Sequence, residues 1–69
     1  MYVSSKDIEQ KYSISRSTVA RTTRLMKELV NKGVLPEKTF VNIGRMIRFD
    51  ESAFLRTKAN ESTLRREYV

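Results

Sequence analysis

Three segments of the chain begin with the same arrangement of apolar and polar residues, one that is typical of a helix start. In each, a helix-capping side chain follows an apolar residue, and a second apolar residue comes five positions after the first. The caps are Ser4, Ser15 and Asp50, and the apolar pairs are Val3 with Ile8, Ile14 with Val19 and Phe49 with Phe54. The pattern predicts helices that begin near Ser5, Arg16 and Glu51.

The first predicted helix is short and the second is long. Residues 13–15 must turn the chain before the second cap, so the first helix ends near Tyr12. The second helix has no breaker before Gly33, which suits the left-handed position past a helix end, and Pro36 forbids resumption. Two helices joined by a turn of about three residues form a helix-turn-helix, whose second helix can enter a DNA major groove.

A helical wheel divides the second helix into an apolar and a basic face. The apolar face, expected in the core, holds Val19, Thr22, Thr23, Met26, Leu29 and Val30, with Leu25 at its edge. The opposite face holds Ser17, Ala20, Arg21, Arg24 and Glu28, with Arg16 and Lys27 on its flank and Thr18 at the helix start. Small residues let a backbone approach base edges, and arginines reach guanine or phosphates. A basic face that only meets solvent is the alternative interpretation.

After Pro36 the apolar residues change from helical to alternating spacing. Residues 40–43 and 46–49 are rich in β-branched and aromatic side chains and flank Gly44 and Arg45, which predicts a β-hairpin. The expected buried face holds Val41, Ile43, Ile47 and Phe49, and the expected outer positions are Asn42, Arg48 and the tip. Arg45 is placed to reach a minor groove or a phosphate. Edge-strand charge that prevents aggregation is the alternative role.

The distribution of charged residues along the chain supports the expectation of a basic binding surface. The 69 residues carry 14 basic and 8 acidic side chains, and the net charge of +6 lies in residues 1–49, since residues 50–69 are balanced. The stretch from Lys11 to Lys27 contains no acid. A surface of one sign is the electrostatic footprint of a protein that binds a polyanion, with nucleic acid first. Binding to an anionic membrane surface through the amphipathic second helix is less favoured, because the core needs that apolar face.

Composition excludes several functional classes. Without cysteine or histidine there is no disulfide, no zinc site of the usual ligands and no imidazole base. The acids form no cluster with a base, and the only glycines, Gly33 and Gly44, have turn roles rather than a phosphate-loop role. The apolar runs are too short for a membrane span or a signal peptide. We therefore expect a protein that is not an enzyme and binds no metal or cofactor. We expect it to be cytoplasmic and associated with the nucleoid.

The chain resembles the small excisionase-type branch of the MerR-like winged helix-turn-helix family over about residues 2–58. The resemblance rests on Ser15–Val19, Arg21, Gly33–Pro36 and Val41–Phe49. It implies that the second helix enters a major groove, that the hairpin forms a wing against the minor groove or backbone, and that a last helix packs beneath. By this resemblance the recognition role falls to Arg16, Ser17, Thr18, Ala20 and Arg21, and the wing role to Arg45 and Arg48. The second helix is longer than in the family and carries Arg24 and Lys27 farther along.

These observations predict an α/β, mainly α, winged helix-turn-helix domain over residues 1–59, ordered helix, helix, strand, strand, helix, with a C-terminal tail over residues 60–69. The expected function is sequence-preferring binding to double-stranded DNA, as an excisionase (recombination directionality factor) of a phage or mobile element. A small transcriptional regulator and the DNA-recognition domain of a phage terminase small subunit are alternatives. Leu64 and Tyr68 could anchor an integrase, and further copies could join on DNA, although a disordered end without a partner is the plainer interpretation.

Overall fold

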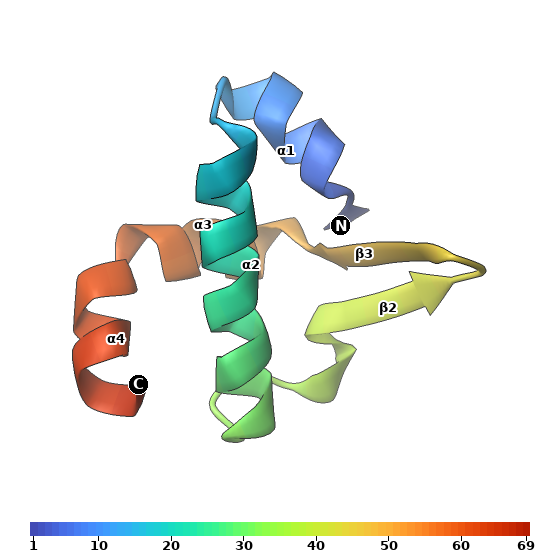
Figure 1. Cartoon of the computed structure of the whole chain (residues 1–69). Helices are drawn as coiled ribbons and strands as arrows, with labels where there is room; N and C mark the ends of the chain where they lie inside the picture. Colours follow the sequence, from blue (N-terminus) through green and yellow to red (C-terminus); the bar gives the residue numbers. More distant parts are fainter.

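A long central helix organises the fold, which the computed structural model describes for residues 1–69. The elements are β1 (Tyr2–Val3), α1 (Ser5–Tyr12), α2 (Arg16–Asn31), the 3-10 helix η1 (Glu37–Thr39), β2 (Phe40–Ile43), β3 (Met46–Asp50), α3 (Glu51–Ala59) and α4 (Glu61–Tyr68). Both α1 and α3 pack on α2, while the β2–β3 hairpin projects to one side and α4 lies on the other (Figure 1). The predicted mainly α fold and its order are confirmed, with β1 and α4 as additions.

The three predicted helix starts are confirmed, because each cap accepts a hydrogen bond from the first turn. The Ser4 hydroxyl accepts from the backbone N–H of Asp7 at 3.1 Å, and the Asp7 carboxylate accepts from the N–H of Ser4 at 3.0 Å. Ser15 caps α2 and Asp50 caps α3 through the same bond to the third helical residue. The helices therefore begin at the three positions that the sequence indicates.

The ends of α1 and α2 depend on left-handed backbone. Ser13 has a φ of 53° and its N–H bonds to the carbonyl of Glu9, which closes α1 at Tyr12 as predicted. This conformation costs a non-glycine residue on the order of 1 kcal/mol, which the packed turn must offset. Gly33 adopts the left-handed conformation after α2, with a φ of 78°, so its predicted role is confirmed.

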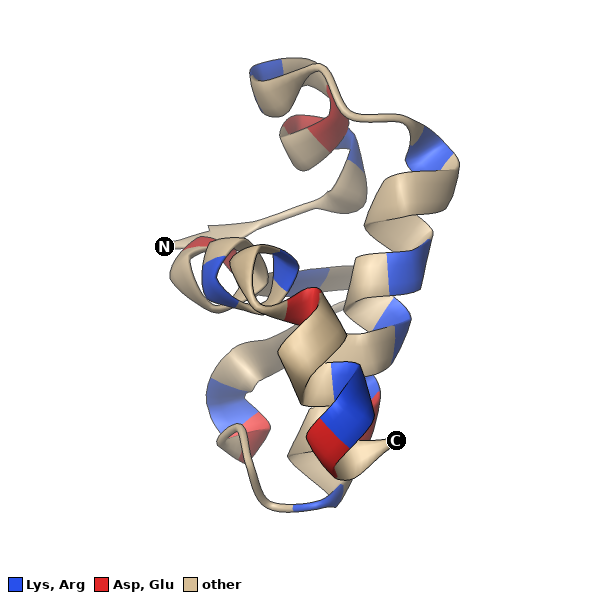
Figure 2. Ribbon diagram, turned by 90° about the vertical axis from the view of Figure 1, so that its left-hand side faces the viewer, with Lys and Arg blue, Asp and Glu red and all other residues tan.

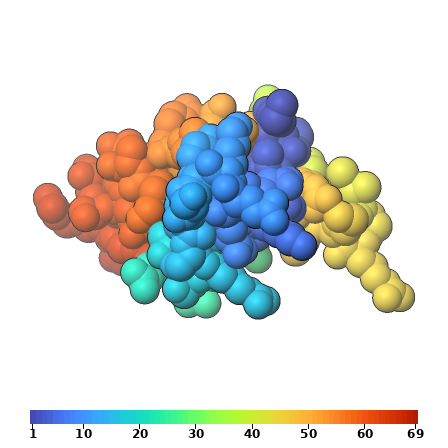
Figure 3. All heavy atoms as spheres, turned by 90° about the horizontal axis from the view of Figure 1, so that it is seen from above, coloured from blue at the N-terminus to red at the C-terminus, as the bar shows by residue number.

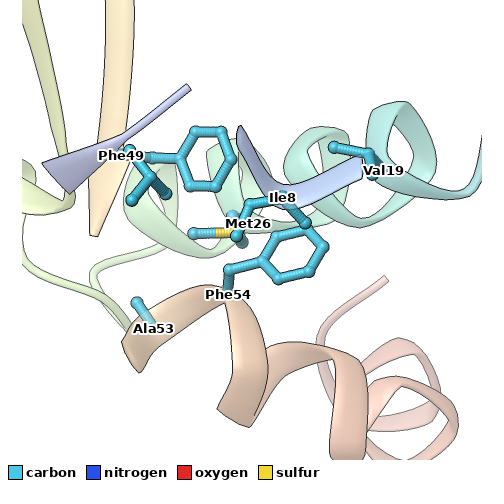
Figure 4. Close-up of a cluster of buried hydrophobic side chains, with 7 residues drawn as sticks. Ile8, Val19, Met26, Phe49, Ala53 and Phe54 are labelled. Atoms are coloured by element: carbon cyan, nitrogen blue, oxygen red, sulfur yellow. The ribbon is translucent and has the colours of Figure 1, made fainter. Parts of the chain in front are cut away.

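The core lies between α1, α2, α3 and the base of the sheet (Figure 4). Its members are Val3, Ile8, Val19, Met26, Phe49, Ala53 and Phe54. The predicted apolar face of α2 needs one correction, because Leu25 is fully buried whereas Thr23 and Val30 are half-buried. The reason is that α4 packs along the Leu25 side of α2, so that the buried face of α2 is shifted toward Leu25.

The predicted buried face of the hairpin is wrong except at Phe49, which is buried. Directly opposite residues of an antiparallel pair share a face, and here Phe40 pairs with Phe49 and Asn42 with Ile47. Val41 and Ile43 therefore lie on the other face of the sheet, where they pair across the strands with Arg48 and Met46 respectively. The two-residue turn forces this register, because it places residues 43 and 46 side by side.

The outer half of the hairpin extends beyond the core (Figure 3). Phe49 is buried, and Phe40 packs against it with ring centres 6.1 Å apart. Ile47 is 51% exposed and Ile43 is 62% exposed, so neither is the core residue that was predicted. No element reaches far enough to cover them, and the wing tip is consequently an exposed apolar surface.

The segment predicted as a tail forms α4. The hydroxyl of Thr22, a buried residue of α2, donates to Glu61 at 3.1 Å, and Leu64 is half-buried against α2 and α3. Tyr68 is half-buried as well. Glu61, Leu64 and Tyr68 follow helical spacing, so one face of α4 meets the domain. Leu64 and Tyr68, predicted as anchors for a partner, are thus partly covered within the chain itself.

A largely covered carboxylate ties α1 to α3. The Glu51 side chain is 12% exposed, and its Oε2 lies 2.8 Å from the ammonium of Lys11 and accepts a hydrogen bond from the Tyr12 hydroxyl. These hydrogen bonds lower the pKa of Glu51, that from Lys11 most, and the bond to Glu51 raises the pKa of both Lys11 and Tyr12. The ionised carboxylate is therefore the form that the fold favours.

Acid is expected to destabilise the domain through Glu51. A carboxyl whose pKa is lowered by folding contributes stability above its ordinary pKa, here 4.5, and loses it as the pH falls through the lowered value. We expect the melting temperature to fall below about pH 4.5, and Glu51→Gln to lower it at pH 7 while flattening the acid limb. Thermal melts from neutral to acid pH test this, and a Glu51→Gln profile parallel to that of the parent would contradict it.

Candidate nucleic-acid interface

One face of α2 is exposed, basic and free of ion pairs. Its cationic side chains are Arg16, Arg21, Arg24 and Lys27, with the small residues Ser17 and Ala20 between them, and all six residues are exposed. The ion pairs of the structure involve only the amino terminus, Lys11 and Arg65 as cations. Basic segments follow one edge of α2 in Figure 2. The predicted recognition residues are thus gathered on one surface, with the exception of Thr18.

Thr18 and Ser17 belong partly to the helix cap. The Ser15 hydroxyl lies 2.8 Å from the Thr18 hydroxyl and 3.3 Å from the Ser17 hydroxyl, and it also accepts the backbone N–H of Thr18. Thr18 is half-buried, whereas Ser17 is exposed. This hydroxyl cluster fixes the start of α2, and Ser15 and Ser17 are its exposed members.

The wing lies beside the second half of α2. A groove of about 350 Å³ runs between them and is lined by Lys27, Val30, Asn31, Phe40, Asn42 and Ile47. The Lys27 ammonium lies 5.9 Å from the centre of the Phe40 ring, within the range of a cation–π contact. Lys27 therefore faces the space between helix and wing, while Arg21 and Arg24 lie on the far side of the exposed face.

The two predicted wing arginines differ in exposure. Arg45 is exposed on the turn, where Gly44 takes a φ of 63°, and the exposed residues Ile43 and Met46 flank the turn. Arg48 is half-buried on the sheet face opposite Ile47, and its guanidinium lies 3.9 Å from the Met46 sulfur. The structure thus places Arg45, and not Arg48, at the exposed tip of the hairpin.

A second groove, of about 280 Å³, lies between α2 and α4. It is lined by Arg21, Arg24, Leu25, Glu28, Arg65 and Val69. Arg65 is a basic residue of this surface that sequence reasoning missed, because residues 60–69 were interpreted as a tail. The helical spacing of Glu61, Leu64 and Tyr68 is the signal that could have indicated the helix carrying it.

No three acidic, histidine or cysteine side chains come together as a metal site would require, and none of the helices has the length and apolar character needed to cross a bilayer. The pKa of Asp7 is lowered by the Ser4 backbone N–H, which is its capping contact.

Comparisons with known proteins found no family model, curated protein or solved structure that matches this chain.

Proposed function

We propose that this protein binds double-stranded DNA with sequence preference, placing α2 in a major groove and the wing against the neighbouring minor groove. One observation carries the proposal: the exposed face of α2 is basic, lacks ion pairs and lies beside a hairpin with an arginine at its tip. Unpaired cations on a single surface favour a polyanion, since each phosphate contact releases a condensed counterion.

The chemistry of the α2 face suits a major groove. The groove, about 12 Å wide, admits one helix, and Ser17 and Ala20 add little bulk at the centre of the exposed face. Arg21 and Arg24 have planar guanidinium groups that can bind guanine through two hydrogen bonds or bind a phosphate. Base readout and backbone positioning are thus both available on the same helix.

The wing suits the backbone and minor groove beside that helix. A DNA strand separates the two grooves, and in this pose it crosses the space between α2 and the wing, where Lys27 lies. Arg45 then reaches the minor groove, with Ile43 and Met46 beside it. Proteins that bind minor grooves combine arginine with apolar side chains in this way.

A membrane-surface role is disfavoured by burial. Val19, Met26 and Leu29 on the apolar side of α2 are almost fully buried in the domain. An amphipathic helix must offer its apolar side to the lipid, so α2 could lie in a bilayer only if the core opened. Salt-sensitive binding to duplex DNA, without binding to anionic vesicles, is the result that we expect.

The biological role that we propose is architectural. The resemblance to excisionase-type proteins favours a recombination directionality factor, which bends DNA or positions an integrase rather than performing chemistry. A small transcriptional regulator uses the same DNA contacts, so binding alone does not separate the two roles. An integrase gene beside this one would support excision.

Arg45→Ala tests the wing. We expect about an eightfold loss of affinity for duplex DNA in 0.1 M salt, the effect of one lost phosphate contact. The melting temperature should change little, because an exposed substitution usually alters stability by less than about 0.5 kcal/mol. Binding isotherms and thermal melts on the same samples give both values.

The matched control is Arg56→Ala. Arg56 is an exposed arginine of α3 that lines two pockets, and no residue of the exposed α2 face lines either of them. Its removal should leave DNA affinity unchanged. Equal affinities of the Arg45→Ala variant and the parent at low salt would remove the wing from the interface.

A further inference from the structure

Helix α4 places a third guanidinium beside two arginines of the exposed α2 face. Arg21 and Arg24 come from α2, Arg65 comes from α4, and all three line the groove of about 280 Å³ between the helices. Arg65 lies more than 40 residues from the others in sequence, so only the docking of α4 brings the three together. We refer to these three residues as the arginine cleft.

Buried contacts fix α4 against α2. Thr22 is fully buried and its hydroxyl donates to Glu61 in the first turn of α4 at 3.1 Å. Leu25 is 2% exposed at the floor of the arginine cleft, and Leu64 packs on the other side of α4 near Leu29. The position of Arg65 is therefore set by the fold rather than by a free chain end.

Three arginine side chains and one acidic side chain, that of Glu28, line the arginine cleft. Neither Arg21 nor Arg24 makes an ion pair, and Arg65 has only Glu61, with 3.9 Å between its Nε and the carboxylate. Glu28 lines the cleft but forms no ion pair with any of the three. Like charges at close range repel, and guanidinium donors are well matched to phosphate oxygens. The cleft thus has the chemistry of an anion site.

We propose that the arginine cleft binds neighbouring backbone phosphates of DNA, so that α4 contacts the strand on the side of α2 opposite the wing. This inference rests on the proposed function. With α2 in a major groove, one bordering strand passes between α2 and the wing, where Lys27 lies, and the other borders α4. A phosphate in the cleft neutralises the repulsion between Arg65 and the α2 arginines, so DNA binding also strengthens the docking of α4.

Arg65→Gln, compared with Arg66→Gln, tests the inference. Arg66 is the next residue of α4, is exposed and does not line the cleft. We expect Arg65→Gln to lower duplex affinity about eightfold in 0.1 M salt and to reduce the slope of log K against log salt by about 0.9. Arg66→Gln should match the parent in both. If neither variant differs from the parent, or if both lose affinity equally, the cleft is not a DNA contact.

A titration with inorganic phosphate separates this inference from the proposed function. In the parent protein, phosphate should shift the NMR signals of the side-chain Nε–H groups of Arg21, Arg24 and Arg65, and not that of Arg66. In Arg65→Gln the shifts of the Arg21 and Arg24 signals should be smaller than in the parent. Phosphate shifts without duplex binding would refute the proposed function and, with it, the DNA source of the phosphate. Duplex binding with no phosphate shift and no effect of Arg65→Gln would overturn the cleft alone.

Discussion

Phe54→Ala is expected to remove about 3 to 5 kcal/mol of stability, most of what a chain of this size possesses. Phe54 is fully buried, and its ring centre lies 5.6 Å from that of Phe49 at the meeting point of α2, α3 and the sheet (Figure 4). Truncation leaves a cavity that the surrounding helices and sheet cannot close. Urea or thermal unfolding followed by circular dichroism should show an unfolding midpoint far below that of the parent.

Leu55→Ala is the matched control. Leu55 follows Phe54 on α3 but is 39% exposed, so its loss removes little packing. We expect its free energy of unfolding to stay within about 1 kcal/mol of the parent value. Similar losses for both variants would mean that the face of α3 that packs on α2 is not the one described.

The helices were predictable because their signals are local. Ser4, Ser15 and Asp50 each act on a backbone N–H three residues away, and Gly33 acts at its own position. Such interactions depend only on residues close together in the sequence, so the starts of α1, α2 and α3 agree with the sequence analysis. The basic face of α2 follows from the same local periodicity.

The errors arose where the structure depends on contacts between residues that are distant in the sequence. Ile47 was predicted to be buried from alternation along one strand, yet burial depends on how far the core extends beneath the hairpin. The pairing of Ile43 with Met46 was readable from the two-residue turn and contradicts the predicted face. In α4, few apolar residues mark a helix, and its docking depends on Thr22, 39 residues from its partner Glu61. Arg65 could not be assigned to the surface without that contact.

DNA affinity is expected to fall about a thousandfold between 50 and 200 mM salt. The basic residues of the exposed α2 face, together with Arg45 and Arg65, provide cations for about six phosphates, and each contributes about 0.9 to the slope of log K against log salt. The predicted slope is therefore near −5. A charge distribution without a defined interface would give a smaller slope, because dispersed cations do not contact phosphates together.

The measurement that tests the central claim most directly is this salt titration on three proteins: the parent, Arg24→Gln and Arg56→Gln. Arg24 lies on the exposed α2 face, whereas Arg56 lies on α3 away from it, and each substitution removes one positive charge. We predict a slope near −5 for the parent and Arg56→Gln, and near −4 for Arg24→Gln. A parent slope near zero, or the same change in both variants, would contradict DNA binding through α2.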